Sequence, residues 1–155
     1  MKWYGNLNNR IMEQGKDAEE ITVGMGVTEF SWSDRHAYEV TKVIDQKHIS
    51  IRELKHTPAD NIPMSNNWKL ESDPTRPEID LVKRGKYWYT SATITQAEVE
   101  KIDAEEDTNK RIEWQLWMCH CGFDRDVIKK NGKQTKYSRR NIRVGYADYY
   151  YDYEF

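Results

Sequence analysis

The fold of this chain is decided by residues 24–40, which read GMGVTEFSWSDRHAYEV. Apolar and polar side chains alternate from Val23 to Trp32, as they do in a half-buried strand. Ser33 and Asp34 have short polar side chains that can bond to nearby backbone amides and turn the chain. An apolar pattern resumes at Tyr38. We therefore predict two antiparallel strands joined by a tight turn.

Two glycines mark the first of these strands. Gly24 and Gly26 are two residues apart, so both would lie on the same face of a strand. A missing side chain permits a bulge, a sharp bend, or the close approach of another backbone or a ligand. We expect the strand to bend or to contact another segment at these positions.

Strand-like runs recur along the first ninety residues, at 49–54 after a turn at 45–47, and then at 68–70, 79–82 and 87–89. The first run slips once in register, and the last two runs form a hairpin across 83–86. Pro58 and Pro63 exclude regular structure from the loop 57–67. Five or six short sequential strands are typical of a small antiparallel barrel or rolled sheet.

The length and composition are those of one domain with a charged surface. The chain has 155 residues, 32% of them charged, with six Trp, ten Tyr and three Phe and a net charge of −2. Large aromatic side chains can supply the core of a small β-rich domain or form a binding face. No apolar run is long enough for a membrane span, and the N-terminus lacks the apolar core of a signal peptide. We expect a soluble intracellular protein without a membrane partner.

The cysteines predict neither a disulfide nor a metal. Cys119 and Cys121 are separated by one residue, which is poor geometry for a mutual disulfide and fits a reducing compartment. Together with His120 they form a Cys-His-Cys cluster, but the second ligand pair of a structural zinc site is missing. We predict two partly buried thiols, no metal and no cofactor.

The second half carries one helix signal and two ambiguous segments. Thr95 and Glu98 fit a capping box for a helix at 95–106. The apolar residues at 112–118 alternate, which favours a strand, although a helix continuing to Gly122 is the alternative. Asn131-Gly132 is typical of a two-residue turn. It predicts a hairpin of 126–130 with 133–137.

Charge is separated along the same half. Residues 129–143 hold seven bases and no acid, whereas residues 146–155 hold five tyrosines, three acids and no base. One interpretation is that the basic hairpin neutralises the acidic helix at 95–106 or the acidic tail, within the fold or between subunits. The other is capture of phosphate groups, with aromatic side chains offering stacking faces.

Several segments in combination resemble a group of small uncharacterised proteins of phages and other mobile elements. They are residues 5–12, 23–28 (VGMGVT), 33–37 (SDRHA), 64–65, 81–88, and the Tyr-rich 144–152 with the final Phe155. The resemblance fails between residues 91 and 141, which implies an inserted arm. It also implies that the Tyr-rich terminal strand returns to the β-rich body.

We therefore expect an α+β, mostly β protein whose single domain spans residues 1–155. A short N-terminal helix covers 5–14, because Tyr4, Leu7 and Ile11 share one face and Gly15 ends it. The small barrel or rolled sheet covers 21–90 and is completed by 142–155. The inserted arm at 91–141 holds a helix and the basic hairpin.

The setting that the resemblance implies is an infected bacterial host, in the cytoplasm. The leading hypothesis is a phage accessory protein that counters host defence by binding, without catalysis. Its partner would be a nucleotide-like immune signal or a defence effector protein. A moderately acidic chain is a poor general binder of duplex DNA. For the immune signal, we predict a pocket at the interface of a homo-oligomer, with ligand-binding residues Trp32, Asp34, Arg35, His36, Tyr38, Arg139, Arg140 and Arg143.

Two other functions stay open. Asp34 and His36 could act as an acid/base pair in a phosphodiester-cleaving enzyme, although no second catalytic histidine or carboxylate cluster accompanies them. The third hypothesis is a structural component of the virion. For the Asp34-Arg35-His36 corner, an ordinary turn held by its own hydrogen bonds is an equally good interpretation.

Overall fold

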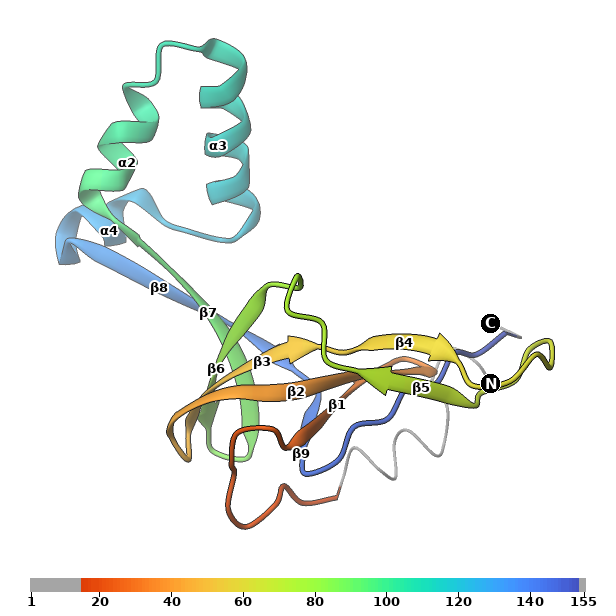
Figure 1. The fold of residues 1–155 in the computed structure, drawn as a ribbon. Coiled ribbons are helices and arrows are strands. Elements are labelled where there is room, and N and C mark those ends of the chain that lie inside the picture. Colours follow the sequence, from red (N-terminus) through yellow and green to blue (C-terminus); the bar gives the residue numbers. More distant parts are fainter. Residues whose placement is uncertain (1–14, 154–155) are drawn as a thin grey trace. The chain divides into compact units, whose positions relative to one another are not determined.

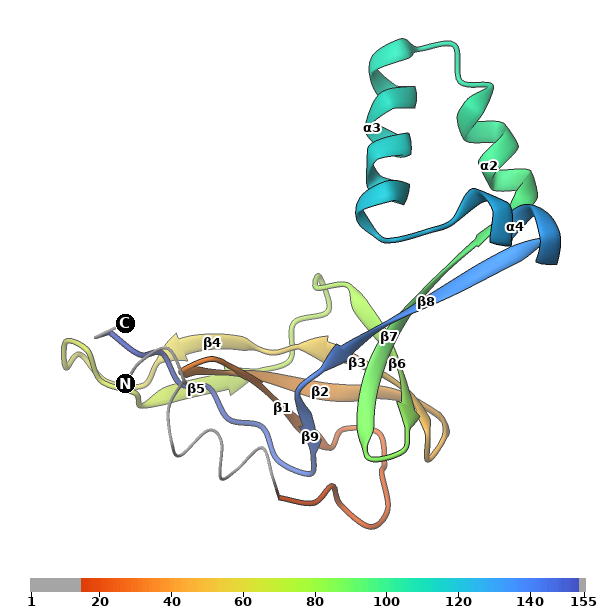
Figure 2. The same cartoon turned by 180° about the vertical axis from the view of Figure 1, so that it is seen from behind.

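The computed structural model describes residues 15–153 as a mostly β fold (Figures 1 and 2). The predicted N-terminal helix at 5–14 lies outside the described residues. The strands are β1 (Gly26–Ser31), β2 (Asp34–Asp45), β3 (His48–Glu53), β4 (Lys55–Pro58), β5 (Trp68–Glu71), β6 (Glu78–Arg84), β7 (Tyr87–Thr95), β8 (Lys133–Arg140) and β9 (Ile142–Val144). The helices are α2 (Gln96–Asp103), α3 (Thr108–His120) and α4 (Arg125–Asn131).

The chain forms two compact units. The first, which we call the β-body, holds the described residues up to Thr90 and from Arg139 onward. The second, the helical unit, holds Ser91–Ser138. The inserted arm predicted from the sequence spans residues 91–141. Strands β7 and β8 each contain a boundary, so the chain passes between the units along these two strands.

The main sheet has seven strands in the order β8-β7-β6-β3-β2-β1-β9 and curls into a half-barrel, so the predicted fold class is confirmed. The hairpin of β1 and β2 pairs Val27 with Tyr38 and Glu29 with His36. The turn between them lies at Trp32 and Ser33, and Trp32 has a φ of 42°. Asp34, predicted as part of the turn, is therefore the first residue of β2.

The strands that follow have the predicted pairings. β2 pairs with β3 with two register shifts, where the sequence predicted one slip. β6 and β7 form the expected hairpin, with Lys83 opposite Trp88. The prediction that 57–67 lacks regular structure is wrong at its start, because β4 continues through Pro58. That proline is tolerated because it is the last residue of the short β4–β5 pair, opposite Trp68.

Close approach of another backbone at Gly26 is confirmed. A Cβ atom on Gly26 would meet the backbone N of Ala147 and would lie 2.7 Å from the carbonyl carbon of Tyr146. Gly24 behaves differently from the prediction, because it precedes β1 in a turn with φ +89° and faces open space. The C-terminal segment therefore crosses β1 where a side chain is missing.

The core of the β-body is filled from the strands named above and from the segment before them. It consists of Ile21, Val27, Tyr38, Val40, Ile49, Ile51, Leu81, Trp88, Ile142 and Val144. The fully buried Trp88 donates its indole N–H to Asp17 Oδ2 over 3.0 Å. Asp17 also accepts from Lys83 Nζ at 2.8 Å and from the backbone N–H of Val144 at 3.0 Å. One carboxylate thus joins three segments of the body.

The C-terminal segment completes the body only partly as a strand. β9 pairs with β1 through Val27 and Val144. Beyond it, the predicted Tyr-rich strand is wrong as a regular element, because Tyr150 forms only an isolated bridge with Arg35. The physical reason is visible at Thr28. Its hydroxyl donates to Tyr146 O and accepts from the N–H of Asp148, so a side chain replaces the regular ladder.

In the helical unit, the predicted capping box of Thr95 and Glu98 is confirmed at the start of α2. The favoured strand at 112–118 is wrong, because these residues lie in α3. Asp107 caps α3 by accepting from the N–H groups of Asn109 and Lys110. The alternating apolar residues do not share one buried face, as they would in a strand. They lie on different faces of the helix, because Met118 is buried whereas Ile112 and Leu116 are exposed.

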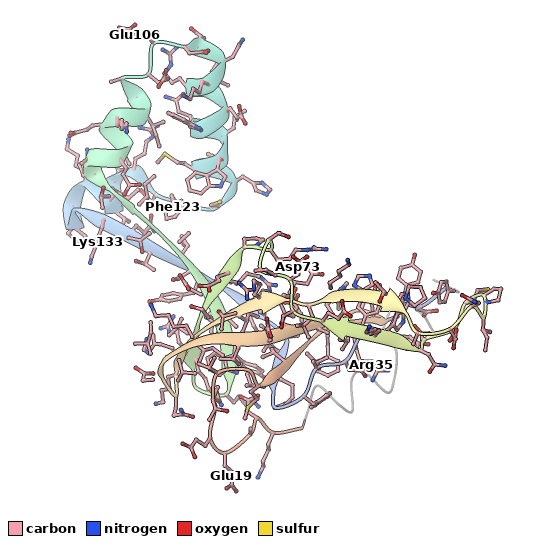
Figure 3. All side chains as sticks on the ribbon, viewed as in Figure 1. Glu19, Arg35, Asp73, Glu106, Phe123 and Lys133 are labelled. Atoms are coloured by element: carbon pink, nitrogen blue, oxygen red, sulfur yellow. The ribbon has the colours of Figure 1, made fainter. Side chains whose placement is uncertain are left out.

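The predicted hairpin at Asn131-Gly132 is also wrong. Residues 125–131 form α4, which Asp124 caps at its start, and Gly132 ends it with φ +80°. The left-handed conformation that suits a two-residue turn also suits a helix C-terminus, and here it ends the helix. Strand β8 then pairs with β7, where the hydroxyls of Thr93 and Thr135 are 2.7 Å apart. Phe123, labelled in Figure 3, belongs to the core of this unit.

Within residues 15–153, no helix is long and apolar enough to cross a bilayer. No group of three or more His, Cys, Asp or Glu side chains in this range is arranged to hold a metal ion. Cys119 is exposed and Cys121 half-buried.

Candidate functional site

The loop between β4 and β5 is organised around the carboxylate of Asp60. This carboxylate accepts hydrogen bonds from Asn67 Nδ2 at 2.7 Å, Ser65 Oγ at 3.0 Å and the N–H of Ile62 at 3.1 Å. Donation from Asn67 first, and then from Ile62, holds the pKa of Asp60 below its usual value. The loop is therefore an ordered structure with a charged centre.

This ordered loop presents apolar side chains to solvent. Ile62 is 66% exposed and Met64 62% exposed, and Met64 has a φ of 61°. A positive φ is rare for a residue with a long side chain and is found where the surroundings hold the backbone in place. The loop therefore holds Met64 in a strained backbone conformation while its side chain stays exposed to solvent.

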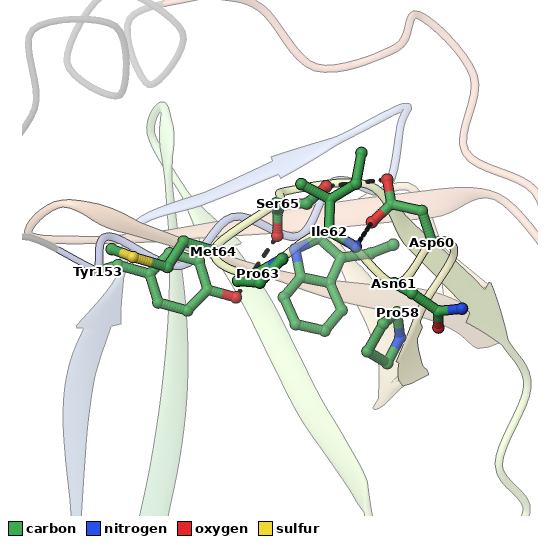
Figure 4. A pocket seen from close by; sticks show the side chains of 9 residues that line it. Pro58, Asp60, Asn61, Ile62, Pro63, Met64, Ser65 and Tyr153 are labelled. Atoms are coloured by element: carbon green, nitrogen blue, oxygen red, sulfur yellow. Dashed lines mark hydrogen bonds between the residues drawn. The ribbon is translucent and has the colours of Figure 1, made fainter.

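A cavity of about 380 Å³ lies in this loop (Figure 4). Its lining residues are Pro58, Asp60, Asn61, Ile62, Pro63, Met64, Ser65, Trp68 and Tyr153. Trp68 is fixed by donating its indole N–H to Asn66 Oδ1 over 3.1 Å. Tyr153 closes the cavity from the C-terminal segment, with its hydroxyl donating to Ser65 O over 3.4 Å.

Asn66 holds the C-terminal segment against this loop. Its Nδ2 donates to Tyr151 O at 3.2 Å, and its Oδ1 accepts from the N–H of Tyr151 at 3.0 Å. The side-chain amide of Asn66 therefore makes the same pair of hydrogen bonds to the Tyr151 backbone that a neighbouring strand would make. Figures 1 and 2 show the C-terminal segment running beside the β4–β5 loop. The N–H of Asp152 donates to Asp34 Oδ1 at 2.8 Å, which adds an anchor on β2.

Aromatic stacking provides a further anchor. The Tyr149 ring stacks on His56 with ring centroids 3.8 Å apart, and Trp68 meets Tyr149 edge-on at 4.8 Å. Burial lowers the pKa of His56 below its ordinary value, with Arg76 and His36 adding to the effect and Glu53 opposing it. Burial likewise raises the pKa of Tyr149. The neutral forms of both rings are therefore the ones that stack.

The result is a surface that we call the aromatic end of the β-body. It consists of the exposed side chains Ile62, Met64 and Tyr153, which line the cavity, and of Tyr151 beside Tyr153. Tyr151 and Tyr153 contact each other edge-on, with ring centroids 4.9 Å apart.

The sequence-predicted site residues fall into separate groups. Asp34, Arg35 and His36 anchor the C-terminal segment: Arg35 pairs with Asp148 at 2.6 Å and lies over the Tyr150 ring. The His36 ring is 6.0 Å from that of Tyr149 and edge-on to it. Trp32, half exposed, lies in the turn between β1 and β2.

Tyr38 and Arg140 meet at a different carboxylate, that of Glu29. The Arg140 guanidinium makes two hydrogen bonds to Glu29, and the Tyr38 hydroxyl donates to Glu29 Oε1 at 3.1 Å. Burial first, and then the Glu29 charge, raise the pKa of Tyr38, while the bond to Glu29 raises the pKa of Arg140. Of the remaining two residues, Arg143 lies 3.6 Å from Asp17, and Arg139 lies 3.6 Å above the Tyr87 ring.

The residues that build the cavity were missed by sequence reasoning. Asp60, Asn66 and Asn67 were treated as part of a proline-containing loop, and Tyr149 as part of a strand. The available signal was the density of Asp, Asn and Ser at 60–67, since these side chains organise loops by bonding to nearby backbone. No sequence pattern indicates that Asn66 reaches Tyr151, 85 residues away.

Comparisons of this chain with protein-family models, with curated proteins and with solved structures found no match.

Proposed function

We propose that this protein is a non-catalytic binding protein that holds a partner protein with the aromatic end of its β-body. The observation that carries the proposal is the exposure of large apolar side chains around a cavity whose walls are fixed by Asp60 and Asn66. Clustered apolar exposure of this kind marks interaction surfaces, and Trp, Tyr and Met are enriched in their centres.

The rigidity of the loop supports this proposal. Ordering flexible side chains and loops on binding costs free energy, so a surface already in its bound conformation binds more tightly for the same contacts. The hydrogen bonds to Asp60 and the stack of His56 on Tyr149 supply this order before any partner arrives. The acidic Asp60 and Asp152 favour a partner with basic groups around its apolar contact.

The resemblance to small proteins of phages and mobile elements suggests the partner. In that setting, a binding protein without catalysis would act on a defence effector of the host. The function we put forward is therefore an accessory protein that blocks such an effector by occupying its surface.

The charges give less support to a nucleotide-like ligand. A phosphate group would have to compete with the carboxylates that engage Arg35 and Arg140. For the enzyme hypothesis, Asp34 is engaged with the backbone of Asp152, and His36 faces the Tyr149 ring. Both groups serve to anchor the C-terminal segment, which supports a structural role for this corner.

A photo-crosslinking amino acid at position 62 tests the proposal in an extract of host cells. The same label at Ile44, which is 68% exposed on β2, is the matched control. The captured protein is then purified, and its affinity is measured by calorimetry against Ile62→Asp, Met64→Asp and Ile44→Asp. We expect losses of at least about tenfold for the first two and none for the third.

Equal affinity of all three variants would contradict the proposal. So would calorimetric binding of a cyclic or ADP-ribose-type nucleotide that Arg35→Gln abolishes in a folded protein.

A further inference from the structure

The helical unit has an exposed apolar surface beside its own core. Its buried core consists of Ile94, Val99, Met118, Phe123 and Ile128. A groove of about 500 Å³ lies between α2 and α3 next to this core, because Ile102 packs against the core and Trp117 contacts Phe123. Its lining residues are Glu98, Lys101 and Ile102 from α2, and Glu113, Trp114 and Trp117 from α3.

A ridge of apolar side chains runs beside this groove on α3. Leu116 is 64% exposed, and Ile112 and Trp117 are each close to half exposed. Residues three or four positions apart are neighbours on a helix surface, so Leu116 adjoins both Ile112 and Glu113. The same helix therefore presents a ridge and one wall of a groove.

Three charged residues line the groove, and one of them, Glu98 on α2, is engaged with Thr95 in the capping box. The other two have opposite signs and lie on opposite helices. Lys101 is on α2, whereas Glu113 is on α3. Within residues 15–153, neither side chain takes part in an ion pair. A uniformly basic partner helix would be repelled by Lys101, and a uniformly acidic one would be repelled by Glu113. A partner that carries both charges in the reverse order satisfies both.

We propose that this face binds a second copy of the chain, with α2 of one copy over α3 of the other about a two-fold axis. A two-fold interface uses the same patch on both copies, so the patch must be complementary to itself. Here the ridge of each copy enters the groove of the other, and Lys101 of each copy meets Glu113 of its partner. Two such helix pairs form a four-helix arrangement.

The small size of the helical unit gives a physical reason for dimerisation. A short segment buries a smaller fraction of its apolar surface than a larger domain does. Covering Leu116, Ile112 and Trp117 in a dimer removes further apolar area from water, which is favourable in proportion to that area. This inference concerns a different surface from the aromatic end and does not rest on the proposed function.

The oligomeric state of the full chain tests the proposal by sedimentation velocity over a broad range of concentration. We expect the unmodified protein to form dimers and Leu116→Glu to be monomeric with an unchanged circular dichroism spectrum. The matched control is Ile44→Glu, which places the same charge at an exposed apolar position of the β-body and should leave the dimer intact.

A charge exchange identifies the partner as a second copy. Lys101→Glu and Glu113→Lys should each weaken their own dimers, because like charges then meet across the axis. An equimolar mixture of the two variants should form heterodimers, which native mass spectrometry distinguishes by mass. A protein that is monomeric at every concentration would overturn the proposal, as would dimers that survive Leu116→Glu or a mixture without enrichment of heterodimers.

Discussion

Gly26 determines, at the scale of single residues, how close the C-terminal segment can come to β1. Backbone atoms of Tyr146 and Ala147 occupy the space in which a Cβ atom would lie. Two residues further along β1, Thr28 is fully buried. Its hydroxyl donates to Tyr146 O and accepts from the N–H of Asp148 in the same segment. A side chain at position 26 would therefore displace the segment from which Tyr149, Tyr151 and Tyr153 extend.

Gly26→Ala should lower the free energy of unfolding by about 1–3 kcal/mol, the usual cost of forcing an extra methyl group into packed space. The matched control is Gly24→Ala, where open space surrounds the position and only the positive φ is strained, at a cost of about 1 kcal/mol. Urea denaturation of both variants measures the difference. A smaller loss for Gly26→Ala than for Gly24→Ala would show that the segment moves away without cost.

At the scale of elements, the C-terminal segment is fixed largely by side chains: Asn66 bonds the backbone of Tyr151, and His56 stacks on Tyr149. Because burial lowers the pKa of His56, the folded protein favours the neutral imidazole. The stability from this stack is fully present above the ordinary histidine pKa of 6.5 and is lost as the pH falls from there towards the lowered pKa.

We therefore expect the midpoint temperature of thermal unfolding to decrease when the pH is lowered from about 7.5 to about 5.5. The decrease should be larger in the unmodified protein than in His56→Phe. Phenylalanine keeps an aromatic ring against Tyr149 but does not titrate. Calorimetric scans at both pH values measure the effect. Parallel pH dependence of the two proteins would show that His56 does not carry it.

At the scale of the whole molecule, the chain leaves the β-body along β7 and returns along β8. These strands are neighbours in the sheet, and the Thr93 and Thr135 hydroxyls lie 2.7 Å apart between them. A pair of antiparallel strands can be closed by a two-residue turn. The helical unit is thus inserted at a place where a hairpin could end.

Replacing Ser91–Ser138 by Asn-Gly should leave a folded β-body with a cooperative unfolding transition, observed through the fluorescence of its buried Trp88. This shortened protein should retain the binding assigned to the aromatic end and should be monomeric, because the face proposed for dimerisation is gone. An unfolded product would show that the β-body depends on the helical unit. A dimeric product would place the dimer interface elsewhere.

Local residue chemistry determined the β-rich part of the fold. Alternation predicted the β1–β2 and β6–β7 hairpins, the missing side chain of Gly26 predicted a close backbone approach, and Thr95 with Glu98 predicted the start of α2. Each of these features depends on neighbours within a few residues or on the alternation of strand faces, so the sequence alone contains the information.

Only the tertiary structure decided the rest. Residues 112–118 fit a strand by alternation, but the burial of Met118 in the core of the helical unit selects a helix. Gly132 permits a turn or a helix end, and the burial of Ile128 in the same core selects the second. The arginines at 139, 140 and 143 gave no sign of their partners, because Glu29, Asp17 and Tyr87 come from distant segments. The cavity likewise needs Asn66 to meet Tyr151 across 85 residues, a contact that exists only once the C-terminal segment has crossed Gly26.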